Sequence, residues 1–292
     1  MKSVPLGLAL GSGAARGWSH IAILRELEVM HLRPAMVSGT SIGALIGAAY
    51  CLDKLDALEA WVRGMRWQDV AGYLDLNLSG GLIAGERVME ALAGMIGDAR
   101  FEDCRIPLAV VATDLETGQE RWLREGRVLD AVRASIALPI LFSPIRHEGR
   151  WLVDGGLVNP VPVSLCRAMG AQRVIAVDLT TDALERQHLG GDGKAMFGPL
   201  DRARRLVKDW LGRESADDTP SILDVMGRSI NIMSLRICRA RMAGDPPDVL
   251  LTPRMPHIGL MDFHQAESAM EAGLQAVRQA DVSLQDLIRT MR

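Results

Sequence analysis

The pentapeptide Gly39-Thr40-Ser41-Ile42-Gly43 has the pattern Gly-x-Ser-x-Gly, in which one serine stands between two small residues. An apolar run at 34–38 precedes it and an apolar segment at 44–50 follows it, which indicates a strand, a tight turn and a buried helix. Such a turn lifts the serine hydroxyl out of the sheet to a helix N-terminus, where backbone amides favour developing negative charge. The pattern therefore predicts a nucleophilic serine at position 41, and a simple glycine-rich turn is the alternative.

A serine hydroxyl is a weak nucleophile until a base takes its proton, so acidic residues are candidates for that base. Asp154 ends an apolar run at 151–154 and is followed by Gly155 and Gly156. These glycines let other backbone approach and leave the carboxylate at a strand end, where partial burial makes it a stronger base. A turn-initiating aspartate is the alternative interpretation.

The histidines keep a second arrangement open. His264 preserves the chain order Ser, Asp, His of an α/β-hydrolase triad, and His257 is a further candidate base. His20 falls in an expected helix and is interpreted as a packed or capping group. A Ser-Asp-His triad therefore stands beside a Ser-Asp pair as the source of the base.

The loop from Gly11 to Gly17 joins an expected strand at 4–10 to an expected helix at 18–30 and exposes several backbone amides in one place. A dinucleotide site would need its third glycine one position earlier and a carboxylate after the next strand, and a P-loop would need Gly-Lys-Ser/Thr. Ser41 lies at the end of the very next strand, and parallel strands bring such ends to one edge of the sheet. We therefore expect an oxyanion hole that serves Ser41, with a nucleotide site and a plain packed turn as the alternatives.

These three motifs, in this order and at this spacing, resemble the patatin-like phospholipase family, and its short bacterial RssA-type members in particular. The similarity spans residues 4 to about 180, and a weaker similarity extends from 243 to 275. The resemblance implies a three-layer α/β/α sandwich with a mainly parallel central sheet and a Ser-Asp dyad that uses no histidine. It implies Ser41 as the nucleophile, Asp154 as the base, an oxyanion hole at Gly11, Ser12, Gly13 and Ala14, and supporting roles for Arg16, Gly17, Gly39, Gly43, Gly155 and Gly156.

The glycine loop departs from the family's usual pattern at Ser12 and Ala14, where glycines ordinarily stand. Both residues still carry an N–H, but if either position needs a positive φ angle, the side chain adds strain or changes the loop. One misaimed donor lowers the rate about 10²–10³-fold. A weakly active regulatory or binding protein on the same fold is therefore an alternative function. Arg16 could favour an anionic head group or brace the loop.

Length and composition limit the number of domains and the kinds of partner that we expect. The 292 residues and 48% apolar content suit one large α/β domain, predicted over 1–292 with a mobile surface insertion at about 184–220. A lid or membrane-facing segment is the functional interpretation of that insertion. The net charge of −3 argues against a nucleic-acid partner, and we expect neither a cofactor nor a metal ion.

The expected cellular location rests on the cysteines, on the first 17 residues and on the length of the apolar runs. Its four cysteines are far apart and without metal-ligand spacing, which indicates buried free thiols in a reducing compartment. Residues 1–17 do not read as a signal peptide, and no run of 18 apolar residues exists to span a membrane. We expect a cytoplasmic protein with peripheral contact at the inner membrane left open, since 236–242 mixes arginine with methionine. The oligomeric state is not predicted.

The chemistry of these residues predicts a serine-dependent hydrolase of acyl-ester bonds. The lipid or phospholipid nature of the substrate comes from the resemblance alone. A triad esterase and a regulatory protein are the two rival predictions.

Overall fold

The computed structural model describes residues 4–73, 86–139, 141–181 and 222–291. Within these residues eight strands form one sheet in the order β5-β6-β3-β2-β1-β7-β8, and β4 pairs with β3 off this path. The pairings among β2, β1, β7, β8 and β3 are parallel, whereas β4 and β6 run antiparallel to β3, and β5 to β6. The strands are β1 Leu6–Leu10, β2 Met36–Thr40, β3 Leu108–Asp114, β4 Glu120–Leu123, β5 Ile145–His147, β6 Arg150–Asp154, β7 Arg173–Val177 and β8 Val249–Leu251.

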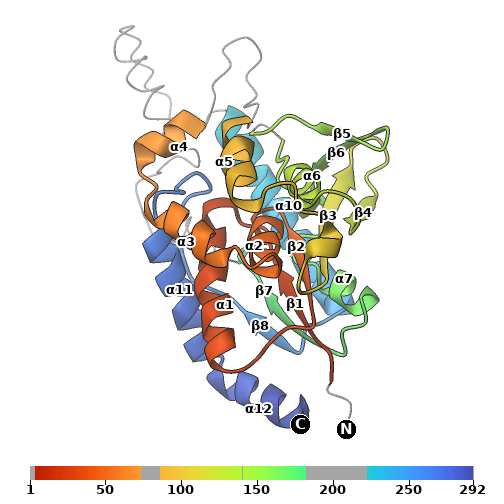
Figure 1. The fold of residues 1–292 in the computed structure, drawn as a ribbon, viewed down its shortest axis with the longest axis vertical. Coiled ribbons are helices and arrows are strands. Elements are labelled where there is room, and N and C mark those ends of the chain that lie inside the picture. Colours follow the sequence, from red (N-terminus) through yellow and green to blue (C-terminus); the bar gives the residue numbers. More distant parts are fainter. Residues whose placement is uncertain (1–3, 74–85, 140, 182–221, 292) are drawn as a thin grey trace, which may run out of the picture.

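Helices cover both faces of the sheet, which makes three layers (Figure 1). The central strand β1 shows why: Leu8 and Leu10 belong to the large core under α1, α2, α6 and α11, while Ala9 belongs to a second core with α7 and α10. Alternate residues of a strand point to opposite faces, so an apolar strand feeds both cores. The helices are α1 Ser19–Val29, α2 Ile42–Cys51, α3 Leu55–Arg63, α4 Trp67–Tyr73, α5 Glu86–Ile96, α6 Val128–Ser135, α7 Val163–Ala168, α10 Ile222–Gly244, α11 Ala266–Gln279 and α12 Asp281–Met291, with 3₁₀ turns η1 Ala14–Trp18, η2 Phe101–Asp103 and η3 Gly155–Leu157.

The predicted fold class, a three-layer α/β sandwich, is confirmed. Local boundaries differ: β2 continues to Thr40 because its pairing with β3 extends to Val111, and the helix expected at 18–30 is preceded by the tight turn η1. Helices α3, α4, α5 and α12 were not predicted from the sequence. Helix α3, for example, begins after Lys54 without a side-chain cap, so it lacks the usual start signal.

Three predictions concern the rest of the chain. The insertion predicted at 184–220 lies outside the described residues, so the single domain over 1–292 stays a prediction. The four cysteines are free thiols as expected, but Cys104 is only partly buried, which corrects the expectation for that residue. Among the helices that the structure describes, none combines the length and apolarity needed to cross a bilayer.

Candidate active site

Ser41 occupies the turn between β2 and α2 with φ 57° and ψ −122°, a backbone conformation that non-glycine residues rarely adopt. The turn forms because its flanks carry no side chain. A Cβ on Gly39 would lie 2.6 Å from the carbonyl oxygen of Gly43, and a Cβ on Gly43 would lie 2.2 Å from that of Leu10. The backbone N–H of Ser41 donates to Oγ of Ser135 at 2.8 Å, which holds the strained turn.

Strand β3 brings the ends of β2 and β6 together. Thr40, the last residue of β2, pairs with Val111, and Asp154, the last residue of β6, pairs with Ala112. Strand β4 pairs with the opposite edge of β3 at Val111 and Ala112. Strands β2 and β6 therefore both lie along the remaining edge of β3, and their last residues meet there. Two residues far apart in the chain, Ser41 and Asp154, therefore face each other.

The Ser41 hydroxyl donates a hydrogen bond to Oδ2 of Asp154 at 2.6 Å. The other carboxylate oxygen, Oδ1, accepts from the backbone N–H of Gly156 at 2.7 Å. Asp154 is 2% exposed, and this burial raises the pKa of its carboxyl to about 6, while the two hydrogen bonds oppose part of the rise. At neutral pH such a carboxylate is ionised and is a stronger base than one in water.

Two residues that the sequence analysis did not assign support this pair. Ser135, which accepts from the Ser41 N–H, donates its own proton to the carbonyl of Val111 at 2.6 Å. Thr113 donates to the backbone carbonyl of Asp154 at 2.8 Å. The stretches around both residues agree with the family pattern, but their roles do not follow from local spacing, because each residue acts on backbone that is distant in sequence.

The glycine loop uses two of its predicted donors for its own structure. The N–H of Gly11 donates to the carbonyl of Val177 at 3.1 Å, and the N–H of Ser12 donates to that of Pro160 at 2.8 Å. Neither amide is available to a substrate oxygen. The predicted set of four donors is corrected on this point, because hydrogen bonds to the scaffold occupy half of it.

The amides of Gly13 and Ala14 have no acceptor among the residues that the structure describes. Both residues line one cavity together with Ser41. Ala14 has φ 49°, so this position does adopt a positive φ angle. A non-glycine residue is strained in that conformation, as expected for such a position. Two amides of this loop therefore remain without a described acceptor at the cavity that Ser41 also lines.

Arg16 and Gly17 stabilise the glycine loop, and Gly155 allows close packing after Asp154. Arg16 is buried and its Nε donates to the carbonyl of Gly13 at 3.4 Å, which fits the bracing interpretation of this side chain. A Cβ on Gly17 would lie 2.2 Å from the side chain of Ile42, so glycine there lets the loop pack on α2. A Cβ on Gly155 would lie 2.3 Å from the carbonyl oxygen of Val111, which requires glycine after Asp154.

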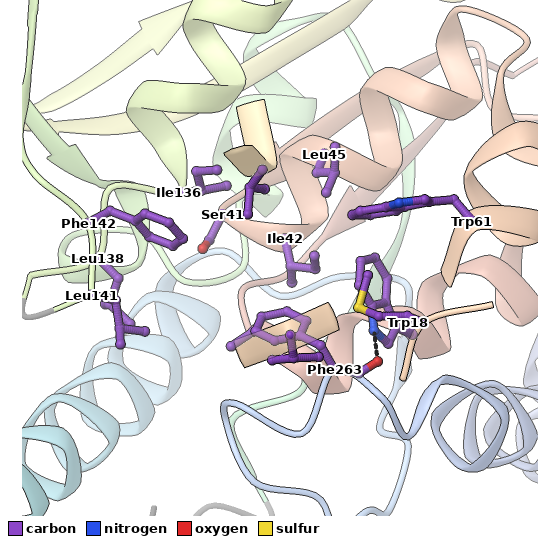
Figure 2. Close-up of a pocket in the computed structure, with 14 residues that line it drawn as sticks. Trp18, Ser41, Ile42, Leu45, Trp61, Ile136, Leu138, Leu141, Phe142 and Phe263 are labelled. Atoms are coloured by element: carbon purple, nitrogen blue, oxygen red, sulfur yellow. Dashed lines mark hydrogen bonds between the residues drawn. The ribbon is translucent and has the colours of Figure 1, made fainter. Parts of the chain in front are cut away.

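An apolar cavity opens beside Ser41 (Figure 2). The Ser41 side chain points into the space bordered by Ile42, Leu138 and Phe142, and the ring of Trp61 closes the far side. Every other lining residue is apolar: Ala14, Trp18, Ile42, Leu45, Trp61, Met65, Val70, Val88, Ile136, Leu138, Leu141, Phe142 and Phe263. A concave apolar surface of this kind suits a hydrocarbon chain.

A second, more polar cavity reaches the same serine. Ser41, Ala14 and Leu138 line both cavities, so the hydroxyl stands at their junction. The polar cavity is also lined by Ser12, Gly13, Arg16, Asp154, Gly156, Leu157, Thr180, Ile230, Asn231, Ser234 and Leu260.

Helix α10 forms one wall of the polar cavity and is tied to the segment after Asp154. Arg241 donates from Nε to the carbonyl of Val158 at 2.6 Å and pairs with Glu120 at 2.6 Å. Asn159 donates to the same Glu120 carboxylate at 2.8 Å. This network fixes α10 against the segment that follows the aspartate.

The histidines lie elsewhere in the described part of the chain. His257 and His264 are exposed, and neither lines the two cavities that reach Ser41; His257 contacts Ser268 instead. His20 is buried against the carbonyl of Gly11 at 2.9 Å, and burial lowers its pKa to about 4, so it is neutral at pH 7. Within the described residues, no group of three or more His, Cys, Asp or Glu side chains could hold a metal ion.

The fold and the site define an α/β protein with a serine at a parallel strand end, hydrogen-bonded directly to a buried aspartate. Residues 8–167, more than half of the chain, match the patatin-like phospholipase family, and the chain belongs to this family. The predicted resemblance is confirmed.

Similar proteins cover nearly the whole chain. The uncharacterized NTE family protein Rv1063c of Mycobacterium tuberculosis is 28% identical over 94% of this chain and 91% of its own length. A second protein of that organism, Rv2565, is 31% identical, and lysophospholipase NTE1 of Coccidioides immitis is 27% identical; this chain spans 48% and 17% of their lengths. VipD from Legionella pneumophila shares the fold, with a TM-score of 0.56 at 13% identity over 96% of this chain and 66% of VipD.

Proposed function

We propose that this protein hydrolyses acyl-ester bonds in lipids or phospholipids, with Ser41 as the nucleophile and Asp154 as its base. The observation that carries the proposal is the 2.6 Å hydrogen bond between these side chains at the junction of an apolar and a polar cavity. Membership of the patatin-like phospholipase family supports a lipid substrate, and one relative is named a lysophospholipase.

In the first half of the reaction, Oγ of Ser41 attacks the ester carbonyl carbon as Asp154 accepts its proton. The tetrahedral oxyanion accepts hydrogen bonds from the amides of Gly13 and Ala14. Collapse breaks the bond to the alcohol, and Asp154 returns the proton to the leaving alkoxide. The product is an acyl ester of Ser41.

In the second half, water attacks the acyl ester while Asp154 takes one of its protons. The second oxyanion forms at the same two amides and collapses, which releases the fatty acid and returns the proton to Ser41. One carboxylate serves both halves because its pKa of about 6 leaves it ionised at neutral pH yet basic enough to accept a proton.

In this proposal the two ends of the substrate bind in the two cavities. The acyl chain lies in the apolar cavity against Trp18 and Phe142, where burial of hydrocarbon drives binding. The alcohol portion lies in the polar cavity against Asn231 and Ser234 of α10. We also propose a cytoplasmic location with peripheral contact at a membrane, because lipid substrates reside there.

Labelling with a fluorophosphonate probe tests the proposal. Wild-type protein should be labelled, Ser41→Ala should not, and Asp154→Asn should be labelled far more slowly. Absence of labelling in the wild type would favour the regulatory or binding protein.

The triad alternative is tested in the same assay. The double variant His257→Gln/His264→Asn should keep wild-type labelling and ester hydrolysis, because Asp154 bonds Ser41 directly. Loss of activity in that variant would reinstate a histidine as the base.

A further inference from the structure

Helix α10 packs on the protein by one face and leaves an apolar face exposed. Leu235 and Cys238 are buried, whereas four large apolar side chains on the opposite face are 42–51% exposed: Val225, Met226, Ile232 and Met233. A surface helix of a globular protein ordinarily turns such residues inward and polar residues outward. An exposed apolar stripe of this kind marks an interaction surface.

The same face is cationic. Between 225 and 244 the chain has four arginines and no acidic residue. Arg241 is tied to Glu120, but Arg228, Arg236 and Arg239 are exposed beside the apolar stripe. Among the described residues no carboxylate lies within ion-pairing distance of these three.

We propose that this face of α10 docks on an anionic lipid surface. Apolar side chains at the centre of the face enter the boundary between head groups and acyl chains, and the arginines pair with lipid phosphates. The charge decides the occupant: between Val225 and Gly244, where the side chains of α10 are described, three exposed arginines and no carboxylate complement a phosphate-bearing surface.

The position of α10 connects docking to the active site. Its inner face lines the polar cavity through Ile230, Asn231 and Ser234, and Ser234 lies 3.5 Å from the carbonyl of Gly156. In Figure 1 the helix passes beside the sheet whose strand ends carry the serine. The inference extends the proposed function: a docked α10 holds the polar cavity against the surface from which a lipid would enter.

Vesicle co-sedimentation of the full chain tests the docking. The probe is vesicles of equal parts phosphatidylcholine and phosphatidylglycerol, with pure phosphatidylcholine vesicles as the neutral reference. The wild type should bind the anionic vesicles more tightly, and binding should fall as salt is added. Ser41→Ala should bind equally, so failure of the hydrolase proposal and failure of docking give different results.

Two double variants identify the face. Arg236→Gln/Arg239→Gln should lower partitioning about 30-fold, because each basic residue near an anionic surface contributes ~1 kcal/mol. Ile232→Ser/Met233→Ser should also lower it. The matched control, Val29→Ser/Val282→Ser, removes more exposed apolar residues elsewhere and should bind as the wild type does.

Urea unfolding shows that each variant is folded, and the variants of α10 should also keep hydrolysis of a soluble short-chain ester, since none of their altered side chains lines either cavity at Ser41. Wild-type vesicle binding by both α10 variants would overturn the proposal, as would no binding by the wild type. Sedimentation of the protein without vesicles tests the other possible occupant of this face, a second copy of the chain. If the α10 variants only convert a dimer to a monomer and vesicle binding is unchanged, the face joins two copies and the lipid proposal fails.

Discussion

The pKa of Asp154 predicts how activity depends on pH. Burial raises that pKa from 3.8 to about 6, and the base must be ionised to accept the Ser41 proton. We expect kcat/KM for an uncharged soluble ester to rise with pH through a midpoint near 6 and to level off above it. At pH 5, one unit below the midpoint, about one-tenth of the plateau activity should remain.

The same shift has a consequence for stability, with a definite sign. Below about pH 3 the carboxyl is protonated in both folded and unfolded chains, so it adds nothing. As pH rises from about 3 to 7, the unfolded chain loses this proton before the folded one, and folding becomes less favourable by roughly 3 kcal/mol, from 2.2 units at 1.36 kcal/mol each. Asp154→Asn removes this titration, so its stability relative to the wild type should increase by about that amount between pH 3 and pH 8.

Two measurements check the pair of expectations: a pH–rate profile, and urea unfolding of both proteins at several pH values. A rate midpoint near pH 4, or a stability difference that does not change with pH, would refute the reasoning about burial. A histidine base would also titrate near 6.5, so the profile is repeated with His257→Gln/His264→Asn. An unchanged midpoint in that variant assigns the titration to Asp154.

Three further substitutions test the architecture around the serine. Ser135→Ala leaves the N–H of Ser41 unpaired, so urea unfolding should show a loss of about 1–3 kcal/mol and probe labelling should slow about 10- to 100-fold; unchanged labelling would contradict the support role. Gly43→Ala places a Cβ 2.2 Å from the carbonyl of Leu10 and should destabilise the fold by about 3 kcal/mol or more, measured in the same way; a stable variant would argue against this close approach. Ala14→Gly removes the φ 49° strain and should raise the free energy of unfolding by about 0.5–1 kcal/mol, after the added freedom of the unfolded chain is subtracted; a decrease would show that the strain is absent.

Local sequence patterns were sufficient for the parts of the site that depend on local structure. The residue types around Ser41 demand a tight strand-to-helix turn, because only glycine fits at Gly39 and Gly43. The apolar run that stops at Asp154 and is followed by two glycines is also a local pattern, and it predicts a strand end. The family and the fold class followed from these motifs and their order, and both are confirmed.

Other features depend on contacts that no local pattern encodes. Local patterns leave aspartate and histidine both open as the base, and the register of β2 and β6 on β3 is what sets Asp154 at 2.6 Å from Ser41. The choice between donors in the glycine loop was likewise tertiary, since Pro160 and Val177 occupy the amides of Ser12 and Gly11.

By itself the sequence determined which residues have chemistry to offer and at which strand ends they stand, because glycine spacing and apolar runs are local constraints on the backbone. Only the tertiary structure decided which of them meet, which amides stay unpaired, and that α10 turns apolar and basic side chains outward beside the site. The physical reason is that hydrogen bonding and burial at the site join segments more than 90 residues apart, as between Ser41 and Ser135.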